Sequence, residues 1–419
     1  MTLIYIYYIK LFIAPQWWLE PFIGIRVDLI LYPVWLAIIS MSKNKKYFYT
    51  ITTIDKYFIF FVCWLLISIA LNTKNELSMQ HATQYILWLL MYKLFQATVT
   101  DFESLKKAVT AMCAVVFLLV IEGIQHKLSF DGLGWAGQGL GWVQKEVLAQ
   151  GGTGRTRWVS IFDGPGVFCI AYTTALPFVM RYMFIPTSKY IKILSTALSI
   201  AFLIAIYFTG SRGGFLATVS ILTLFIMYKS NISISKLLII SAVLVVLFSL
   251  APSHLTNVKD SSNSAQHRVD MWGKGADMFR YHPVLGVGRG NYKSYSYLLI
   301  AHNSMIEIMA ETGFPGVFFW VALIYLAFKG LYLAHKNEDK RDNKMFITSI
   351  AISLAGYLVS SIFVTAEFET MYMLIAFAAI ASANEHKTLV FSAMEKIYLA
   401  GFIIFLYLFI RLFVGMYFG

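Results

Sequence analysis

The chain has 419 residues, of which 58% are hydrophobic and 16% aromatic, and its mean hydropathy is +0.67. Only 13% of the residues are charged, about half the usual share, which excludes an ordinary soluble domain. The net charge of +12 is typical of basic cytoplasmic loops that meet anionic membrane lipids, and we expect no nucleic-acid partner. The composition therefore predicts an all-α, polytopic membrane protein, with one membrane domain over residues 1–419.

Apolar segments recur along the whole chain, and most are long enough to cross a bilayer as helices. They predict about 12 to 13 transmembrane helices, near residues 2–14, 24–41, 57–72, 83–99, 107–125, 164–184, 193–209, 212–228, 237–252, 313–334, 345–364, 370–384 and 396–417. The first segment lacks a basic leader and a small-residue cleavage site, so we interpret it as a short first span. The cysteines, Cys63, Cys113 and Cys169, lie in apolar runs without metal or disulfide spacing.

Lysine and arginine residues concentrate in loops that lie on one side if the helices alternate. These loops fall near residues 42–56, 106–107, 181–192, 229–236 and 335–344. Short loops rich in Lys and Arg stay in the cytoplasm, so this side is predicted to be cytoplasmic. Two long loops, 126–163 and 253–312, then lie on the opposite side of the membrane.

The second long loop is predicted to contain an amphipathic helix. Val269, Trp272, Ala276 and Phe279 share one stripe at helical spacing, and Pro283 ends the pattern. We expect this helix to lie on the membrane bundle or at the membrane interface.

Arginines stand out on the side predicted to lie opposite the cytoplasm. They are Arg155, Arg157, Arg212, Arg268, Arg280 and Arg289. A guanidinium stays charged and offers a planar fork to phosphate oxygens, so the cluster suits a membrane-bound diphosphate. Glycines flank Arg212 and Arg289, and backbone can approach a ligand closely there. The alternative for Arg212 is an interfacial arginine that extends toward water.

The stretch "AHNSMIEIMAETGFPGVFFW" (301–320) places an ionisable His302 before a predicted span. If one helix ran through this stretch, Glu307 and Glu311 would lie on other faces from His302, so its partner should come from elsewhere. Glu367 and Glu369 are the candidates for that partner or for a base, although solvated loop carboxylates are the plainer interpretation of both. Charges within or near spans are functional hypotheses by default; they are Arg26, Asp28, Lys93 and Glu122, with a pair between Arg26 and Asp28 or between helices as the simpler account of Arg26. Lys93 and Arg411 are the charges that fit the mid-membrane depth expected of a transporter. The sequence contains no DxD pair and no HExxH motif, so we predict no metal site.

Arg212, the glycine-rich stretch around Arg289 and the His302–Asn303 pair follow one another along the chain. With these motifs in this order, the chain resembles the superfamily of O-antigen ligases and Wzy-type polymerases, most strongly over about residues 150–335. His302 and Asn303 are followed by nine residues and then by Gly313 to Gly316, which is the ligase signature. Arg212 and Leu216 meet the accompanying Arg-x-x-x-L pattern. Arg155 and Gly166 also satisfy the Arg-x10-Gly spacing proposed for polymerases.

The resemblance implies a metal-independent membrane glycosyltransferase that uses no cofactor. Its donor would be an undecaprenyl-diphosphate-linked glycan, and its acceptor a hydroxyl on lipid A core or on another glycan, at the periplasmic face of a bacterial inner membrane. His302 and Arg212 would be catalytic; Arg289, Arg268, Arg155, Arg157 and Asn303 would bind the diphosphate or glycan. A polymerase of lipid-linked repeats is the first alternative. A protein O-oligosaccharyltransferase and a lipid-linked oligosaccharide flippase are the others.

Overall fold

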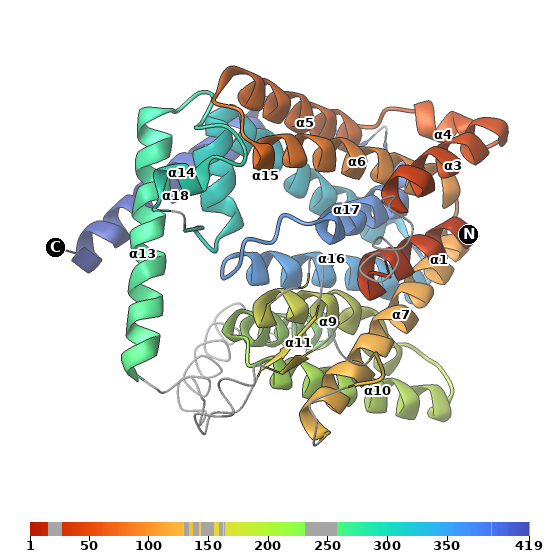
Figure 1. Cartoon of the computed structure of the whole chain (residues 1–419). Helices are drawn as coiled ribbons and strands as arrows, with labels where there is room; N and C mark the ends of the chain where they lie inside the picture. Colours follow the sequence, from red (N-terminus) through yellow and green to blue (C-terminus); the bar gives the residue numbers. More distant parts are fainter. Residues whose placement is uncertain are drawn as a thin grey trace. The chain divides into compact units, whose positions relative to one another are not determined.

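Helices dominate the chain because the backbone of an apolar segment in lipid has no water to satisfy its polar N–H and C=O groups, and a helix satisfies them internally. A computed structural model describes residues 1–15, 27–129, 134–136, 142–143, 155–158, 162, 164–230, 258–297, 299–386 and 388–418. Two short strands, β1 (Trp142–Val143) and β2 (Thr156–Arg157), pair antiparallel. The remaining regular structure of the described residues is helical (Figure 1).

Eight described helices are long and apolar enough to cross a membrane. They are α5 (Thr53–Leu71), α7 (Phe102–Leu128), α9 (Pro165–Met180) with the turn η3 (Arg181–Met183), α10 (Lys189–Thr209), α11 (Arg212–Ser230), α15 (Ser304–Asn337), α16 (Arg341–Ser361) and α18 (Ala393–Phe418). Shorter apolar helices are α1 (Thr2–Tyr8), which continues into the π-helix η1 (Ile9–Ile13), α3 (Val27–Met41) and α17 (Glu369–Ala381). The prediction of an all-α, polytopic membrane protein is confirmed.

Of the other predicted segments, one is a helix that is not among these eight, and one lies outside the described residues. The segment near 83–99 lies within α6 (Glu76–Thr98), which is long enough to span but carries His81, Gln84 and Lys93. Residues 237–252 lie outside the described part of the chain, as does most of the loop 126–163. Every predicted segment that the structure describes is thus helical, and eight of these helices meet the length and hydropathy of a span.

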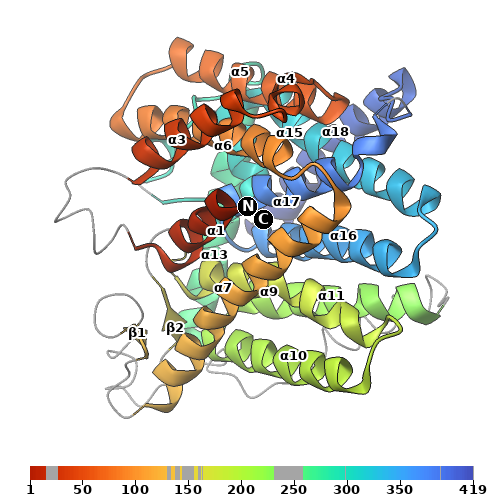
Figure 2. The same ribbon diagram turned by 90° about the vertical axis from the view of Figure 1, so that its right-hand side faces the viewer.

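The described chain divides into two compact units. Unit 1 comprises Met1–Lys45, Phe95–Thr256 and His335–Phe363, and unit 2 comprises Lys46–Leu94, Asn257–Ala334 and Val364–Gly419. In unit 1, α9 packs against α7, α10, α11 and α16, and Figure 2 shows α9, α10 and α11 running side by side. Helix α9 is accordingly buried almost throughout, whereas much of α10 is exposed.

Basic residues gather at one end of unit 1. Nζ of Lys106, at the start of α7, lies 2.6 Å from Asp342 at the start of α16, and Arg181 lies 3.5 Å from the same carboxylate. The Lys229 ammonium, at the end of α11, lies over the Phe184 ring after η3. Four of the predicted cytoplasmic loops therefore meet at this end, which is the geometry that alternating helices require.

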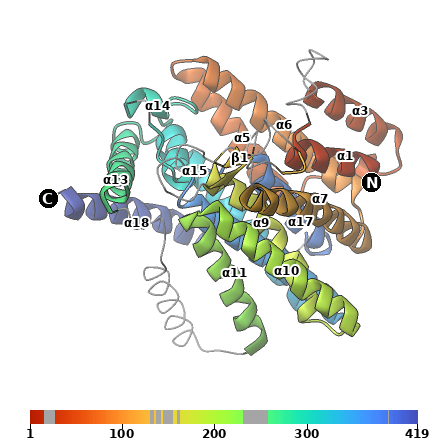
Figure 3. The same ribbon diagram turned by 60° about the horizontal axis from the view of Figure 1, so that its bottom comes forward.

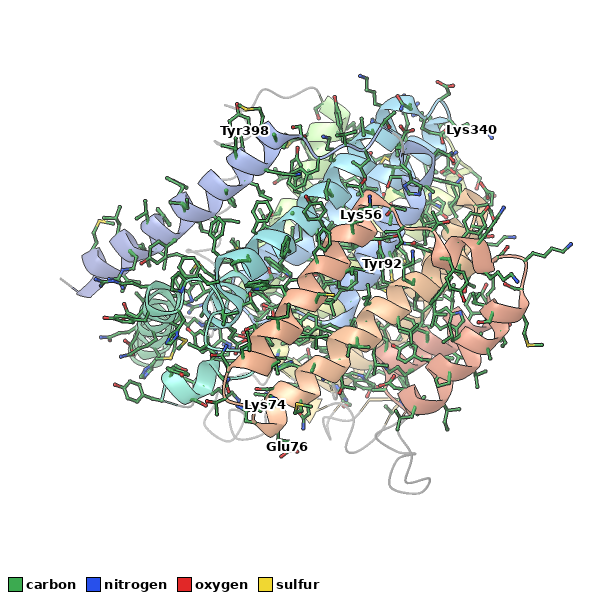
Figure 4. All side chains as sticks on the ribbon, turned by 90° about the horizontal axis from the view of Figure 1, so that it is seen from above. Lys56, Lys74, Glu76, Tyr92, Lys340 and Tyr398 are labelled. Carbon is green, nitrogen blue, oxygen red and sulfur yellow. The ribbon has the colours of Figure 1, made fainter. Side chains whose placement is uncertain are left out.

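In unit 2, α5 and α6 run antiparallel, joined by a short connection. Figure 4 shows Lys56 and Tyr92 at one end of this pair and Lys74 and Glu76 at the other. At the first end, Asp55 caps α5 and forms an ion pair of 2.8 Å with Lys93. The helices α4 (Lys45–Tyr49) and α14 (Tyr292–Tyr295) and the 3-10 turn η4 (Ala383–Glu385) are shorter.

The predicted amphipathic helix is α13 (Val258–Tyr281), and it packs on α18 (Figures 1 and 3). Val269, Ala276 and Phe279 are buried. The rings of Trp272 and Phe279 contact those of Phe413 and Tyr407 on α18. The expected stripe is therefore the packing face of α13, and its partner is a helix of this chain.

Helix α15 has a kink at Gly313, where φ is 67° and ψ is −170°. A Cβ at this residue would clash with the Val284 carbonyl, so the backbone requires glycine there. Pro315 follows at the start of the second segment, where its missing N–H costs nothing. The Gly-Phe-Pro-Gly stretch thus starts a new helix segment, and Ser304 to Thr312 form a first segment that carries Glu307 and Glu311.

Candidate active site

His302 lies in unit 2, between the end of α14 and the start of α15. Its φ is 51°, in the left-handed region that few residues other than glycine adopt. Asn303, the next residue, caps α15: its Oδ1 accepts a hydrogen bond of 3.1 Å from the Ile306 N–H. The helix therefore begins at Ser304, and the angles of a continuous helix do not apply to His302.

The residue before His302 is held on both of its polar backbone groups. The Ala301 N–H donates a hydrogen bond of 3.0 Å to Oε1 of Glu307. The Ala301 carbonyl accepts a hydrogen bond of 3.0 Å from the Trp272 indole N–H on α13. Thr365 donates a second hydrogen bond, of 2.6 Å, to the same oxygen of Glu307. Glu307 thus fixes the loop that presents His302, although it does not touch the imidazole.

The imidazole of His302 is half-buried beside Arg268. Partial burial lowers the pKa of His302, and the nearby Arg268 charge lowers it further. The ring is therefore neutral at physiological pH and can accept a proton.

Arg289 lies in a buried cluster of carboxylates in the same unit. It is only 4% exposed. Nη2 lies 2.6 Å from Oε2 of Glu367, and Nη1 forms a direct ion pair with Glu311 and lies 3.9 Å from Glu307. Its guanidinium also lies 5.9 Å from the centre of the Tyr85 ring. One buried cation therefore faces three carboxylates.

The glycine-rich loop that carries Arg289 packs directly against α15. The N–H groups of Gly290 and Tyr292 donate hydrogen bonds of 3.0 and 2.9 Å to Oε1 of Glu311. At Gly290, φ is 92° and an added Cβ would lie 2.8 Å from the Ser78 nitrogen. The glycines thus permit a close approach to the protein's own backbone, where the sequence had suggested an approach to a ligand.

Glu367 and Glu369 are buried, at 3% and 5% exposure, so the interpretation as solvated loop carboxylates is wrong. Oε2 of Glu367 accepts a hydrogen bond of 3.2 Å from the Tyr85 hydroxyl. Burial raises the pKa of Glu367 to about 8, because it outweighs the attraction of Arg289, and Glu307 and Glu311 raise it further. This carboxyl contacts Arg289 and Tyr85, and the structure gives it no contact with His302.

Arg155 and Arg212 come together in unit 1. Arg212 is the first residue of α11, whose N-terminus is capped by Ser211 through a hydrogen bond of 3.0 Å from the Gly214 N–H. The Arg155 side chain lies over Gly210 and close enough for the Arg212 charge, after burial, to lower the pKa of Arg155. Both are half-buried, and Arg157 follows two residues later on β2. Two cations at a helix N-terminus form a favourable anion site.

The charged residues predicted within or near spans form ion pairs wherever the structure describes them. Lys93 pairs with Asp55, Asp28 with Lys10, Glu122 with His126, and Arg411 with Asp277, while Arg26 lies outside the described residues. These pairs satisfy charges that would otherwise be costly in a membrane protein. Among the described residues, no group of three or more His, Cys, Asp or Glu side chains could hold a metal ion.

Sequence reasoning missed the roles of Glu307, Glu311, Tyr85, Trp272 and Thr365. Glu307 and Glu311 are four residues apart on one face of an apolar helix, and a spacing of this kind was a readable signal. Nothing in the sequence pointed to Tyr85 or Thr365, because both reach the cluster from distant parts of the chain.

The fold and these residues define a multi-pass membrane protein. Residues 197–321 match the family model described as O-antigen ligase, a family of membrane glycosyltransferase type. The match includes Arg212, Arg268, Arg289 and His302, and it confirms the resemblance over a narrower range than expected. No curated protein matches the chain.

Proposed function

We propose that the protein transfers a glycan from an undecaprenyl-diphosphate-linked donor to a hydroxyl group of lipid A core, at the periplasmic face of a bacterial inner membrane. The family match supports activity of the ligase or polymerase type. The surroundings of His302 support the proposed transfer reaction further. Its imidazole is half-buried and neutral beside Arg268, and its backbone has a left-handed conformation.

In the proposed reaction, the acceptor hydroxyl oxygen attacks the anomeric carbon of the donor glycan. His302 takes the hydroxyl proton as the new C–O bond forms. The bond between the anomeric carbon and the diphosphate breaks, and undecaprenyl diphosphate leaves with the electron pair. The residues proposed to act in this step are His302 as the base and arginines that stabilise the growing negative charge.

Arg155, Arg157 and Arg212 in unit 1, and Arg268 in unit 2, are proposed to bind the diphosphate or glycan. Arg155 and Arg212 provide two guanidinium groups at the N-terminus of α11, which suits phosphate oxygens. Asn303 already caps α15, so its contribution to glycan binding would come in addition to that role. Arg289 was predicted to bind the diphosphate as well, but its carboxylate contacts favour a structural role.

The proposed periplasmic side follows from each unit considered by itself. In unit 1, Arg212 begins α11 and Lys229 ends it among the basic loops. In unit 2, the loop carrying Arg289 is hydrogen-bonded to Ser68, in the last turns of α5, and to Asn75, in the connection that follows α5. Lys56 lies at the opposite end of α5 (Figure 4). If the basic ends are cytoplasmic, the proposed site residues of both units face the periplasm.

A polymerase that extends lipid-linked repeats is the second candidate, because Arg155 and Gly166 keep the Arg-x10-Gly spacing. Purified protein should be incubated with lipid-linked repeat units, with and without lipid A core. We expect capped lipid A core only when that acceptor is present. Longer lipid-linked chains without it would establish the polymerase, and no transfer in either reaction would contradict both.

A further inference from the structure

The backbone of His302 is strained, and both of its neighbours in the chain are held by hydrogen bonds. The Ala301 carbonyl belongs to the peptide that precedes the His302 Cα, and the Trp272 indole holds it at 3.0 Å. On the other side, the carbonyl of the next residue, Asn303, accepts a hydrogen bond of 3.1 Å from the Glu307 N–H as part of the first turn of α15. A φ of 51° at a residue with a Cβ persists only where the surroundings enforce it.

Glu307 links this loop to the segment between α16 and α17. Its Oε1 accepts hydrogen bonds from the Ala301 N–H at 3.0 Å and from the Thr365 hydroxyl at 2.6 Å. One residue further on, the Ala366 N–H donates a hydrogen bond of 2.8 Å to the Ser304 hydroxyl. Residues 365 and 366 are therefore bound to both the side chain and the first turn that set the position of His302.

We propose that Thr365 and Trp272 are positioning residues for His302, acting through Glu307 and the Ala301 peptide. Thr365 orients the Glu307 carboxylate that holds the Ala301 N–H, and Trp272 holds the carbonyl of the same residue. Neither side chain needs to touch substrate. This inference rests on the proposed function, since it assigns these residues to the geometry of the base.

The chemical reason is that proton transfer depends steeply on geometry. A displacement of about 1 Å at a reacting group can lower a rate about a hundredfold. Loss of one hydrogen bond to the loop should displace the imidazole while leaving the arginines unchanged. The turnover number should therefore fall, and the KM for the lipid-linked donor should stay the same.

The main test compares Thr365→Val with Thr365→Ser. Valine has a similar shape but cannot donate to Glu307, whereas serine keeps the hydroxyl. We expect kcat to fall about tenfold or more in Thr365→Val, with donor KM and thermal stability unchanged, and to recover largely in Thr365→Ser. Trp272→Phe, which keeps an aromatic ring but loses the N–H, should reproduce the Thr365→Val result.

A matched control is Thr53→Val, which removes another threonine hydroxyl in unit 2, one that donates to the Leu389 carbonyl at 2.9 Å at the Lys56 end of α5. This control should keep wild-type kcat. Wild-type kcat in Thr365→Val, or a loss carried by KM or by thermal stability, would overturn the inference.

A double variant separates this inference from the proposed function. In a His302→Gln background, Thr365→Val should not lower the residual rate further, because the group that it positions has been removed. An equal loss in both backgrounds would overturn the positioning role. Unchanged activity of His302→Gln alone would contradict the proposed base, and that result is distinct from either outcome for Thr365.

Discussion

Nη2 of Arg289 lies 2.6 Å from Oε2 of Glu367, although 78 positions separate the two residues in the chain and both are buried. The contact joins the glycine-rich loop before α14 to the segment before α17. It also means that the guanidinium is engaged by carboxylates in this structure. Arg289 and Arg212, which look alike in the sequence, are therefore expected to respond differently to substitution.

Arg289→Ala should lower thermal stability as well as activity. It leaves the buried carboxylate of Glu311 without its cation, and removal of one partner from a buried ion pair typically costs about 3–5 kcal/mol. Thermal unfolding of the detergent-solubilised protein would measure this, with Arg280→Ala, an exposed arginine of α13, as the control. Wild-type stability with weakened donor binding would instead support the diphosphate contact predicted from the sequence.

Arg212→Lys should lose activity without losing stability. Lysine keeps the charge but not the planar pair of donors, and loss of one well-placed donor to developing charge costs roughly 3 kcal/mol, or a hundredfold or more in rate. Initial rates with the lipid-linked donor would show the loss, and Arg280→Lys is the matched control. Full activity of Arg212→Lys would show that this arginine only anchors the helix end.

His302→Ala should abolish most transfer while leaving a folded protein that still binds donor. The expected loss for a general base is about 10² to 10⁴ in rate. Since burial and Arg268 lower the pKa of His302, the neutral form should predominate at pH 7, and kcat/KM should decline only as the pH falls below the ordinary histidine value. His302→Gln should lose both the activity and this acidic decline. Near wild-type transfer by His302→Gln would leave the residue a structural role.

Glu367→Gln should change how stability depends on pH. The pKa of Glu367 is raised to about 8 in the folded protein, so folding favours its protonated form. Its contribution to stability is therefore present at low pH and is lost as the pH rises through about 8. Wild-type protein should lose thermal stability between the ordinary glutamate pKa of 4.5 and about pH 8 more steeply than Glu367→Gln, which cannot ionise. Parallel curves for the two proteins would contradict the assignment.

Cysteine labelling should place the two ends of α15 on opposite sides of the membrane. Ser294 precedes this helix, Asp339 follows it, and both side chains are exposed. In a background without Cys63, Cys113 and Cys169, we expect Ser294→Cys to react with an impermeant reagent from the periplasm and Asp339→Cys only after the membrane is opened. The reverse pattern would contradict the proposal that the site faces a donor on the periplasmic side.

Much of the fold was determined by the sequence alone, because the requirement that backbone groups in lipid be satisfied internally leaves helices as the outcome for long apolar runs. The spans, the packing stripe of α13 and the new helix segment after Gly313 were all predictable from local patterns. His302 and Arg212 were also found from the sequence, through motif spacing; their proposed roles remain predictions.

Only the tertiary structure decided the surroundings of these residues. Local spacing showed that Glu307 could not face the His302 ring from one helix, but not that its carboxylate holds the Ala301 N–H together with Thr365, 58 positions away. Glu367 looked like a solvated loop residue because a short polar stretch carries no information about what packs over it. Burial and long-range hydrogen bonds depend on which segments meet in space, and that depends on the packing of the whole unit.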